Sequence, residues 1–238
     1  MTVIFADGFE NHVFVPPWTS TTISAGCTLD ILTTNPHHGT YHARSKSAGN
    51  ASDSAAARKY ISAAPIAFAS AAFEFVSLGI PVGERVTFLW AGDGTYAYFV
   101  EAAIFNVLGT LKWYLGVIEN NVYTWYAGTH TPVTGTYYRV EIKRDVTNGL
   151  ESLWVDGVLE ASAVQVITQN TTVFYVGQIF QTGAGINEIY FDCAVVADAY
   201  YGQETMLYEC LSHKESGTIV TTTELSYSSD KLSYYDSS

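Results

Sequence analysis

Apolar and polar residues alternate along several short segments of the chain, which is the pattern of β-strands with one buried face. In segment 137–143 the apolar residues Tyr138, Val140 and Ile142 alternate with charged residues. Further segments rich in aromatic and β-branched residues predict strands at 97–106, 110–117, 122–127, 172–178 and 187–197. No segment shows a convincing helical period, although the Ala- and Ser-rich segment 48–60 suits a loop or a short helical turn.

Turn sequences join these segments as hairpins. Asn120-Asn121 and Asp156-Gly157 each separate two strand-like segments, and both pairs tolerate the left-handed backbone that a tight hairpin turn requires. Strands and helices do not alternate along the sequence. The pattern therefore predicts an all-β fold, a two-sheet antiparallel sandwich of jelly-roll type.

The composition divides the chain into two parts, a sandwich domain over 1–198 and a C-terminal extension over 199–238. Of the 23 residues from 216 to 238, 14 are Ser, Thr or Tyr. Segments 219–227 and 232–235 are nevertheless β-prone. Two alternatives stay open: a frayed tail, or an arm that adds strands to the sheet edge of a neighbouring subunit.

Charge and hydropathy exclude several classes of protein. The 238 residues carry a formal charge of −12, and 48% of them are hydrophobic, so the chain is neither a disordered polyelectrolyte nor a nucleic-acid-binding protein. No apolar run reaches the ~20 residues that span a bilayer, and the first residues show no signal-peptide pattern. The irregularly spaced Cys27, Cys193 and Cys210 are expected to be buried thiols.

Segments 5–10, 35–43 and 189–196, with the central stretch 125–159, resemble the concanavalin-A-like and laminin-G-like jelly rolls and the related β-sandwich carbohydrate-binding modules. The resemblance spans about 3–198. It implies the same architecture but does not specify an activity. Jelly-roll proteins of tailed bacteriophage particles are also similar, which implies a role as capsid decoration, fibre or adhesion module.

The same resemblance implies a structural calcium ion. Asp7, Glu10 and Asp192 would supply carboxylates, and backbone carbonyls near Gly39 and Thr40 would complete the oxygen ligands that Ca²⁺ prefers. Cys193 stands where the family often has a second acid. The alternative is that these acids cap turns. Calcium binding predicts a lower melting temperature in a chelator.

No catalytic constellation is visible, and the sequence predicts a non-enzymatic protein. Segment 188–192 carries acids, but it lacks the three-acid spacing of the jelly-roll glucanases. His37, His38 and His42 cluster without a Cys or Glu at metal-ligand spacing nearby, so we expect solvated loop histidines.

Aromatic side chains give a second candidate site. If Trp113 and Leu115 fill the core, strand alternation turns Tyr114 outward, and the same reasoning makes Tyr123, Trp125 and Trp154 candidates for an exposed face. Exposed rings stack on sugars or on a protein partner. The alternative is that both faces are covered and the rings belong to the core.

These inferences favour a non-enzymatic structural protein of a phage or virus particle, held by homo-oligomeric contacts or by other virion proteins. The alternative is a carbohydrate-binding module at a cell surface or outside the cell, with a glycan as its partner. Neither nucleic acid nor a membrane is expected as a partner.

Overall fold

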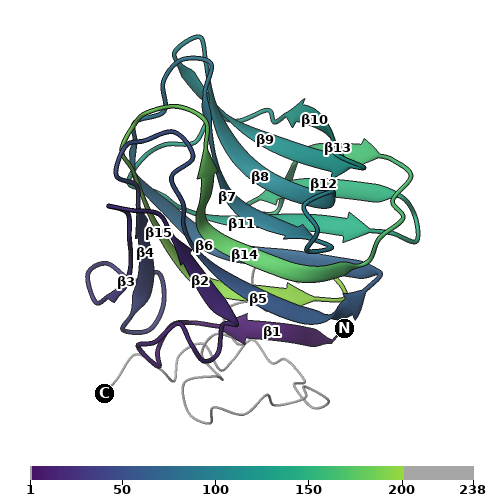
Figure 1. Cartoon of the computed structure of the whole chain (residues 1–238), viewed down its shortest axis with the longest axis horizontal. Helices are drawn as coiled ribbons and strands as arrows, with labels where there is room; N and C mark the ends of the chain where they lie inside the picture. The colour runs from purple at the N-terminus through teal and green to yellow at the C-terminus, as the bar shows by residue number, and fades with distance from the viewer. Residues whose placement is uncertain (1, 201–238) are drawn as a thin grey trace, which may run out of the picture.

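The computed structural model describes residues 2–200, and these residues form an all-β fold (Figure 1). The fifteen strands are β1 (Val3–Asp7), β2 (Ser20–Ile23), β3 (Thr28–Leu32), β4 (His42–Lys46), β5 (Ala55–Ala64), β6 (Ile66–Leu78), β7 (Arg85–Gly92), β8 (Tyr98–Val107), β9 (Thr110–Glu119), β10 (Val122–Ala127), β11 (Tyr137–Asp145), β12 (Leu150–Val155), β13 (Val158–Val164), β14 (Thr171–Gln181) and β15 (Asn187–Ala197). No helix that is long and apolar enough to cross a membrane occurs among the described residues. Almost all of the extension predicted as an assembly arm, 199–238, lies outside them.

The strands form two antiparallel sheets packed face to face. Sheet A has eight strands in the order β13-β12-β11-β6-β15-β4-β3, with β1 paired to β15 beside β4. Sheet B has seven strands in the order β10-β9-β8-β7-β14-β5-β2. Consecutive strands often lie in different sheets or far apart within one sheet, as Figure 1 shows for β14 and β15. The predicted two-sheet jelly-roll sandwich is confirmed.

The predicted hairpins are also confirmed. Asn120 and Asn121 both have positive φ between β9 and β10, and Asp156 and Gly157 do the same between β12 and β13. The prediction for 48–60 is wrong in its second half, because β5 begins at Ala55 and continues to Ala64. Its first residues, Ala55, Ala56 and Ala57, are fully buried, and a small side chain with no β-branch gives no strand signal in the sequence.

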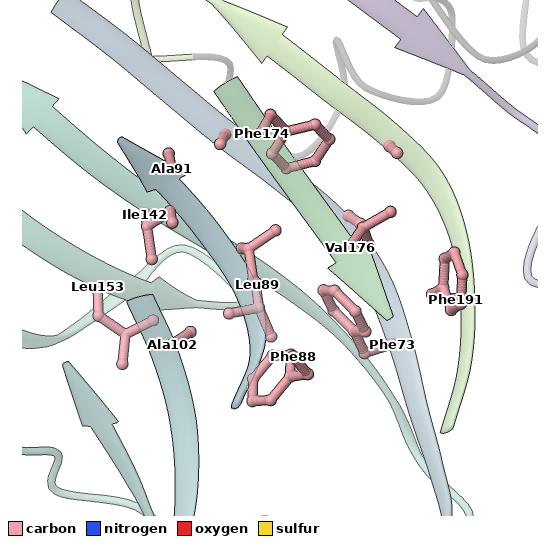
Figure 2. Close-up of a cluster of buried hydrophobic side chains, with 14 of the residues drawn as sticks. Phe73, Phe88, Leu89, Ala91, Ala102, Ile142, Leu153, Phe174, Val176 and Phe191 are labelled. Carbon is pink, nitrogen blue, oxygen red and sulfur yellow. The ribbon is translucent and has the colours of Figure 1, made fainter. Parts of the chain in front are cut away.

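The core between the sheets is rich in aromatic rings. Phe73 of β6 meets Phe88 of β7 edge to face, with 4.8 Å between ring centroids (Figure 2). Phe174 and Phe191 extend this cluster from β14 and β15. Alanines of β5 and β6 lie among these rings, so the strands of the two layers supply large and small side chains that interdigitate.

A buried ion cluster links the two sheets at one end of the sandwich. The guanidinium of Arg144 on β11 is fully buried and donates to the carboxylates of Glu119 on β9 and Glu151 on β12. A second guanidinium nitrogen lies 3.4 Å from the Gln169 carbonyl oxygen. Burial raises the pKa of the Glu151 carboxyl, although Arg144 opposes the shift. The network therefore depends on the single cation that it surrounds.

Candidate functional site on the outer face of sheet B

Strand alternation sends half of the side chains of sheet B away from the core. On β8, Val100, Ala102 and Ile104 face the core, so Phe99 and Glu101 face outward. The register places one outward residue of each of six strands side by side. We call this set the outer row, and it consists of Arg58, Tyr175, Trp90, Glu101, Gly116 and Trp125 in that order. At about 4.8 Å between strands, the outer row spans roughly 24 Å.

Gly116 makes room for the Trp125 ring. A Cβ atom at Gly116 would lie 2.5 Å from the Trp125 ring and 2.7 Å from Cγ of Glu101. The six-membered ring of Trp125 therefore occupies the space beside Gly116 where a side chain would lie, next to Glu101. Trp125 is half-buried. A glycine at this position is required for the arrangement, because any side chain would displace the ring.

Arg85 lies among aromatic rings at the same end of the row. Its guanidinium carbon is 4.7 Å from the centroid of the Trp125 ring, and the rings of Phe105 and Phe180 are also within cation–π distance. Burial raises the pKa of the neighbouring Glu101 to about 7, against the opposing influence of Arg85. A carboxyl group of this kind exchanges its proton near neutral pH.

The opposite end of the row is built from tyrosines and a second arginine. Tyr96, in the loop between β7 and β8, has a positive φ, and its hydroxyl lies 2.6 Å from the Tyr175 hydroxyl. Arg58 lies 5.0 Å above the Tyr60 ring and contacts the Tyr175 hydroxyl. Tyr60 and Tyr96 are about half exposed. Trp90 and Phe99, which lie beneath this group, are buried.

Neither arginine of this face has a carboxylate partner. Most of the described cations form salt bridges, but Arg58 and Arg85 are in none of the ion pairs found among residues 2–200. Nε of Arg85 is buried and has no hydrogen-bond partner within the described part of the chain. The face therefore combines exposed rings with two arginines that form no salt bridge among the described residues, although Arg85 lies near the Glu101 carboxyl.

The structure brings together three of the four predicted face residues. Tyr114, Tyr123 and Trp125 all lie on the outer face of sheet B; the Phe105 ring packs against the Tyr114 ring with 4.3 Å between centroids, and Tyr123 contacts Phe99. Trp154 instead lies on the outer face of sheet A, against Phe68 and Tyr200. Their role in binding stays a prediction.

Sequence reasoning missed the arginines, Trp90, Tyr175 and Glu101. Alternation along β8 would have placed Glu101 between the outward-facing Phe99 and Phe105. Nothing in the sequence shows which strands lie next to each other. The neighbours of Glu101 could therefore not be named without the register.

The three acids predicted to hold calcium accept hydrogen bonds from the protein itself. Asp7 binds the Trp18 indole N–H at 2.6 Å, and Glu10 accepts the backbone N–H groups of Thr40 and Tyr41. Asp192 accepts those of His38 and Cys193, at 2.9 and 2.7 Å.

The loop 38–41 thus turns N–H groups toward these carboxylates, where the calcium hypothesis expected carbonyl oxygens. Asp7, Glu10 and Asp192 are not among the described side chains that gather three metal-ligand atoms. Calcium at these acids stays a prediction, and melting curves with and without a chelator would test it.

The expectation of solvated histidines is wrong for His42, which is fully buried on β4 and packs against the Tyr190 ring. Its two ring nitrogens have no hydrogen-bond partner within the described part of the chain. His37 and His38 are partly buried, and burial lowers the pKa of each.

Comparison with known proteins identifies a fold class but no family. No family model and no curated protein matches the sequence. Among solved structures, the cellulose-induced protein Cip1 is similar with a TM-score of 0.64 and 15% identity, over 83% of this chain and 99% of that one. An endo-β-1,4-glucuronan lyase from the fungus Trichoderma reesei matches with a TM-score of 0.58 and 14% identity, over 84% and 97% of the two chains.

An alginate lyase, AlyC3, matches with a TM-score of 0.52 and 12% identity, over 66% of this chain and 74% of the lyase. At these identities the comparison establishes the fold: a jelly-roll β-sandwich, as the resemblance implied. The prediction of a non-enzymatic protein is wrong as an inference from this fold, because two lyases share it over most of the chain.

Proposed function

We propose that the protein binds an extended, acidic polysaccharide along the outer face of sheet B. The observation that carries the proposal is the outer row, which places rings and Arg58 across six neighbouring strands, together with Arg85, which lies beside the Trp125 end of the row; neither arginine is in a salt bridge found among residues 2–200. Aromatic faces stack on the apolar faces of sugar rings, and guanidinium groups form paired hydrogen bonds with carboxylates.

The ligand class follows from charge and from the compared structures. The chain as a whole carries a formal charge of −12, so a polyanion needs a local cationic site, and this face supplies one. Two of the similar structures are of a glucuronan lyase and an alginate lyase. We therefore favour a polymer of uronic acids over a neutral glucan. Because exposed charges are screened by salt, we expect the binding to weaken as ionic strength rises.

Replacing Trp125 by alanine is expected to weaken binding of alginate or glucuronan oligosaccharides about 30-fold. The lost ring stacks on a sugar, and an aromatic anchor of this kind contributes about 2 kcal/mol. Isothermal titration calorimetry with purified oligosaccharides measures the effect.

Trp154→Ala is the matched control, since Trp154 is another half-buried tryptophan but lies on the outer face of sheet A. Its affinity should equal that of the wild type. Arg85→Gln should weaken binding of uronate oligosaccharides more than binding of neutral cello-oligosaccharides. Equal losses from Trp125→Ala and Trp154→Ala would contradict the assignment of the face.

A second candidate function is β-elimination of the bound uronate polymer, which Glu101 favours. Its pKa of about 7 suits general base catalysis, and Arg85 lies close enough to affect its charge. Glu101 is only 5% exposed, so a neighbouring side chain would have to move before Glu101 could take the proton from the carbon beside the uronate carboxyl group. The C–O bond to the next sugar would break, the double bond would form, and the leaving oxygen would take a proton from solvent.

The assay is the ultraviolet absorption of the unsaturated product formed from alginate or glucuronan. Activity that falls about 100-fold or more in Glu101→Gln, with binding retained, would support this chemistry. A protein that binds these polymers and releases no unsaturated product would refute the elimination reaction and leave the binding proposal intact.

The compared structures favour the carbohydrate-binding alternative over the virion role, which stays a prediction. Binding of an acidic polysaccharide would agree with a location at a cell surface or outside the cell. Homo-oligomeric contacts and a role for 199–238 in assembly remain predictions as well, and a truncation after residue 200 would test them by its effect on oligomeric state.

A further inference from the structure

Strand β15 carries an irregularity on the outer face of sheet A, remote from the outer row of sheet B. Its pairing with β6 shifts between Asp192 and Val195, and Cys193 has a φ of 50°. This is a β-bulge, which turns two successive side chains to the same face. Because Phe191 and Ala194 face the core, Asp192 and Cys193 both face outward. A non-glycine residue at positive φ costs energy and is kept where the surrounding structure requires it.

Hydrogen bonds hold the loop before β4 over this bulge. The Asn35 amide donates to Glu74 at 2.8 Å, and the Tyr137 hydroxyl donates to the Asn35 carbonyl oxygen at 2.9 Å. The backbone N–H of His38 then donates to Asp192. These contacts come from β6, β11 and β15, so the position of the loop is fixed by three strands of sheet A.

The result is a cluster of nitrogen and sulfur ligands. One ring nitrogen of His37, one of His38 and the sulfur of Cys193 all lie within 4.8 Å of one another. Around a tetrahedral zinc ion, such atoms are about 3.3–3.6 Å apart, as the usual bond lengths require. Side-chain rotations that move these atoms by roughly 1 Å would therefore bring them to the distances that zinc requires.

We propose that His37, His38 and Cys193 form a zinc-binding site. Two imidazoles and a thiolate suit Zn²⁺, which prefers nitrogen and sulfur ligands, whereas Ca²⁺ and Mg²⁺ prefer oxygen. With three protein ligands, the fourth position is open to water or another oxygen ligand. Binding replaces the S–H bond of Cys193 by a bond to zinc and releases the proton to solvent.

Two features suit a metal better than simple packing. Nδ1 of His37 is buried and has no hydrogen-bond partner within the described residues, and a metal would satisfy it. The Asp192 carboxylate accepts the backbone N–H groups of both His38 and Cys193, so one side chain positions two of the three ligand residues. Groups that orient ligands in this way are a regular part of metal sites.

The test uses the full chain, stripped of metal and titrated with Zn²⁺ alone and with Ca²⁺ alone. One equivalent of Zn²⁺ should bind and raise the melting temperature, while Ca²⁺ at the same concentration should not compete for the site. With Co²⁺ as a spectroscopic substitute, a thiolate-to-metal charge-transfer band should appear. Cys193→Ala should abolish the band and weaken Zn²⁺ binding about 100-fold or more.

Cys27→Ala and Cys210→Ala are the control variants, and both should bind zinc as the wild type does. His38→Gln keeps the thiol and should also weaken binding, which guards against a Cys193 variant that fails to fold. The proposal is overturned if the wild type binds no zinc, if Cys193→Ala binds it unchanged, or if Cys210→Ala alone abolishes the charge-transfer band.

Discussion

Replacing Arg144 by methionine is expected to lower the free energy of unfolding by about 3–5 kcal/mol. The guanidinium is fully buried, and its removal leaves the carboxylates of Glu119 and Glu151 near each other without a cation. An uncompensated charge in a low-dielectric interior is one of the few single changes with so large an effect. Equilibrium unfolding in urea measures it.

Two further variants separate charge from packing. Adding Glu151→Leu to Arg144→Met should recover much of the loss, because the second change removes the buried acid that the first one isolates. Arg44→Met removes a partly exposed arginine from its ion pair with Asp30 and should cost less than about 1 kcal/mol. A double variant no more stable than Arg144→Met would show that the loss comes from side-chain volume.

Glu101→Gln is expected to stabilise the protein by about 3 kcal/mol at pH 8 and to have little effect near pH 4. Burial raises the pKa of Glu101 in the folded protein to about 7, from 4.5 for the free group. The folded state thus holds the proton more tightly than the unfolded state. The contribution of Glu101 to stability is complete below pH 4.5 and is lost as the pH rises through 7. A shift of this size corresponds to about 3 kcal/mol.

The difference between wild type and variant is the quantity to measure, because other groups change stability over the same range. Burial lowers the pKa of His37 to about 4, so its contribution to stability falls as the pH drops below 6.5, opposite to that of Glu101. Urea unfolding from pH 4 to 8 gives both curves. A constant difference between them would show that Glu101 does not titrate in this range.

Much of the fold could be predicted from local pattern. Strand β10 and strand β15 begin and end where the alternation and the turn residues place them. The hairpin turns follow from residues that tolerate positive φ, which is a property of the single residue. Strand β5 was missed because its burial comes from alanines packed beneath larger rings, and those rings belong to distant segments.

The ion pairs of Arg144 are a second feature that the local sequence pattern could not predict. Alternation along β11 places Arg144 on the same face as Val140 and Ile142, which is the core face. The sequence alone does not show which acidic residue would pair with this buried guanidinium. The partner Glu119 comes from the opposite sheet. Pairing between sheets depends on how the layers stack, which no local pattern records.

The sequence by itself determined that this chain builds a sandwich and where several of its strands and turns lie, and it made Tyr114 of β9 and Tyr123 and Trp125 of β10 candidates for an exposed face. These features depend on the period of the strand and on the conformational range of single residues. Only the tertiary structure decided that Arg58, Glu101 and Trp125 share one row and that Cys193 meets His37 and His38. Those juxtapositions depend on strand order, register and a bulge, which are set by the packing of the whole chain.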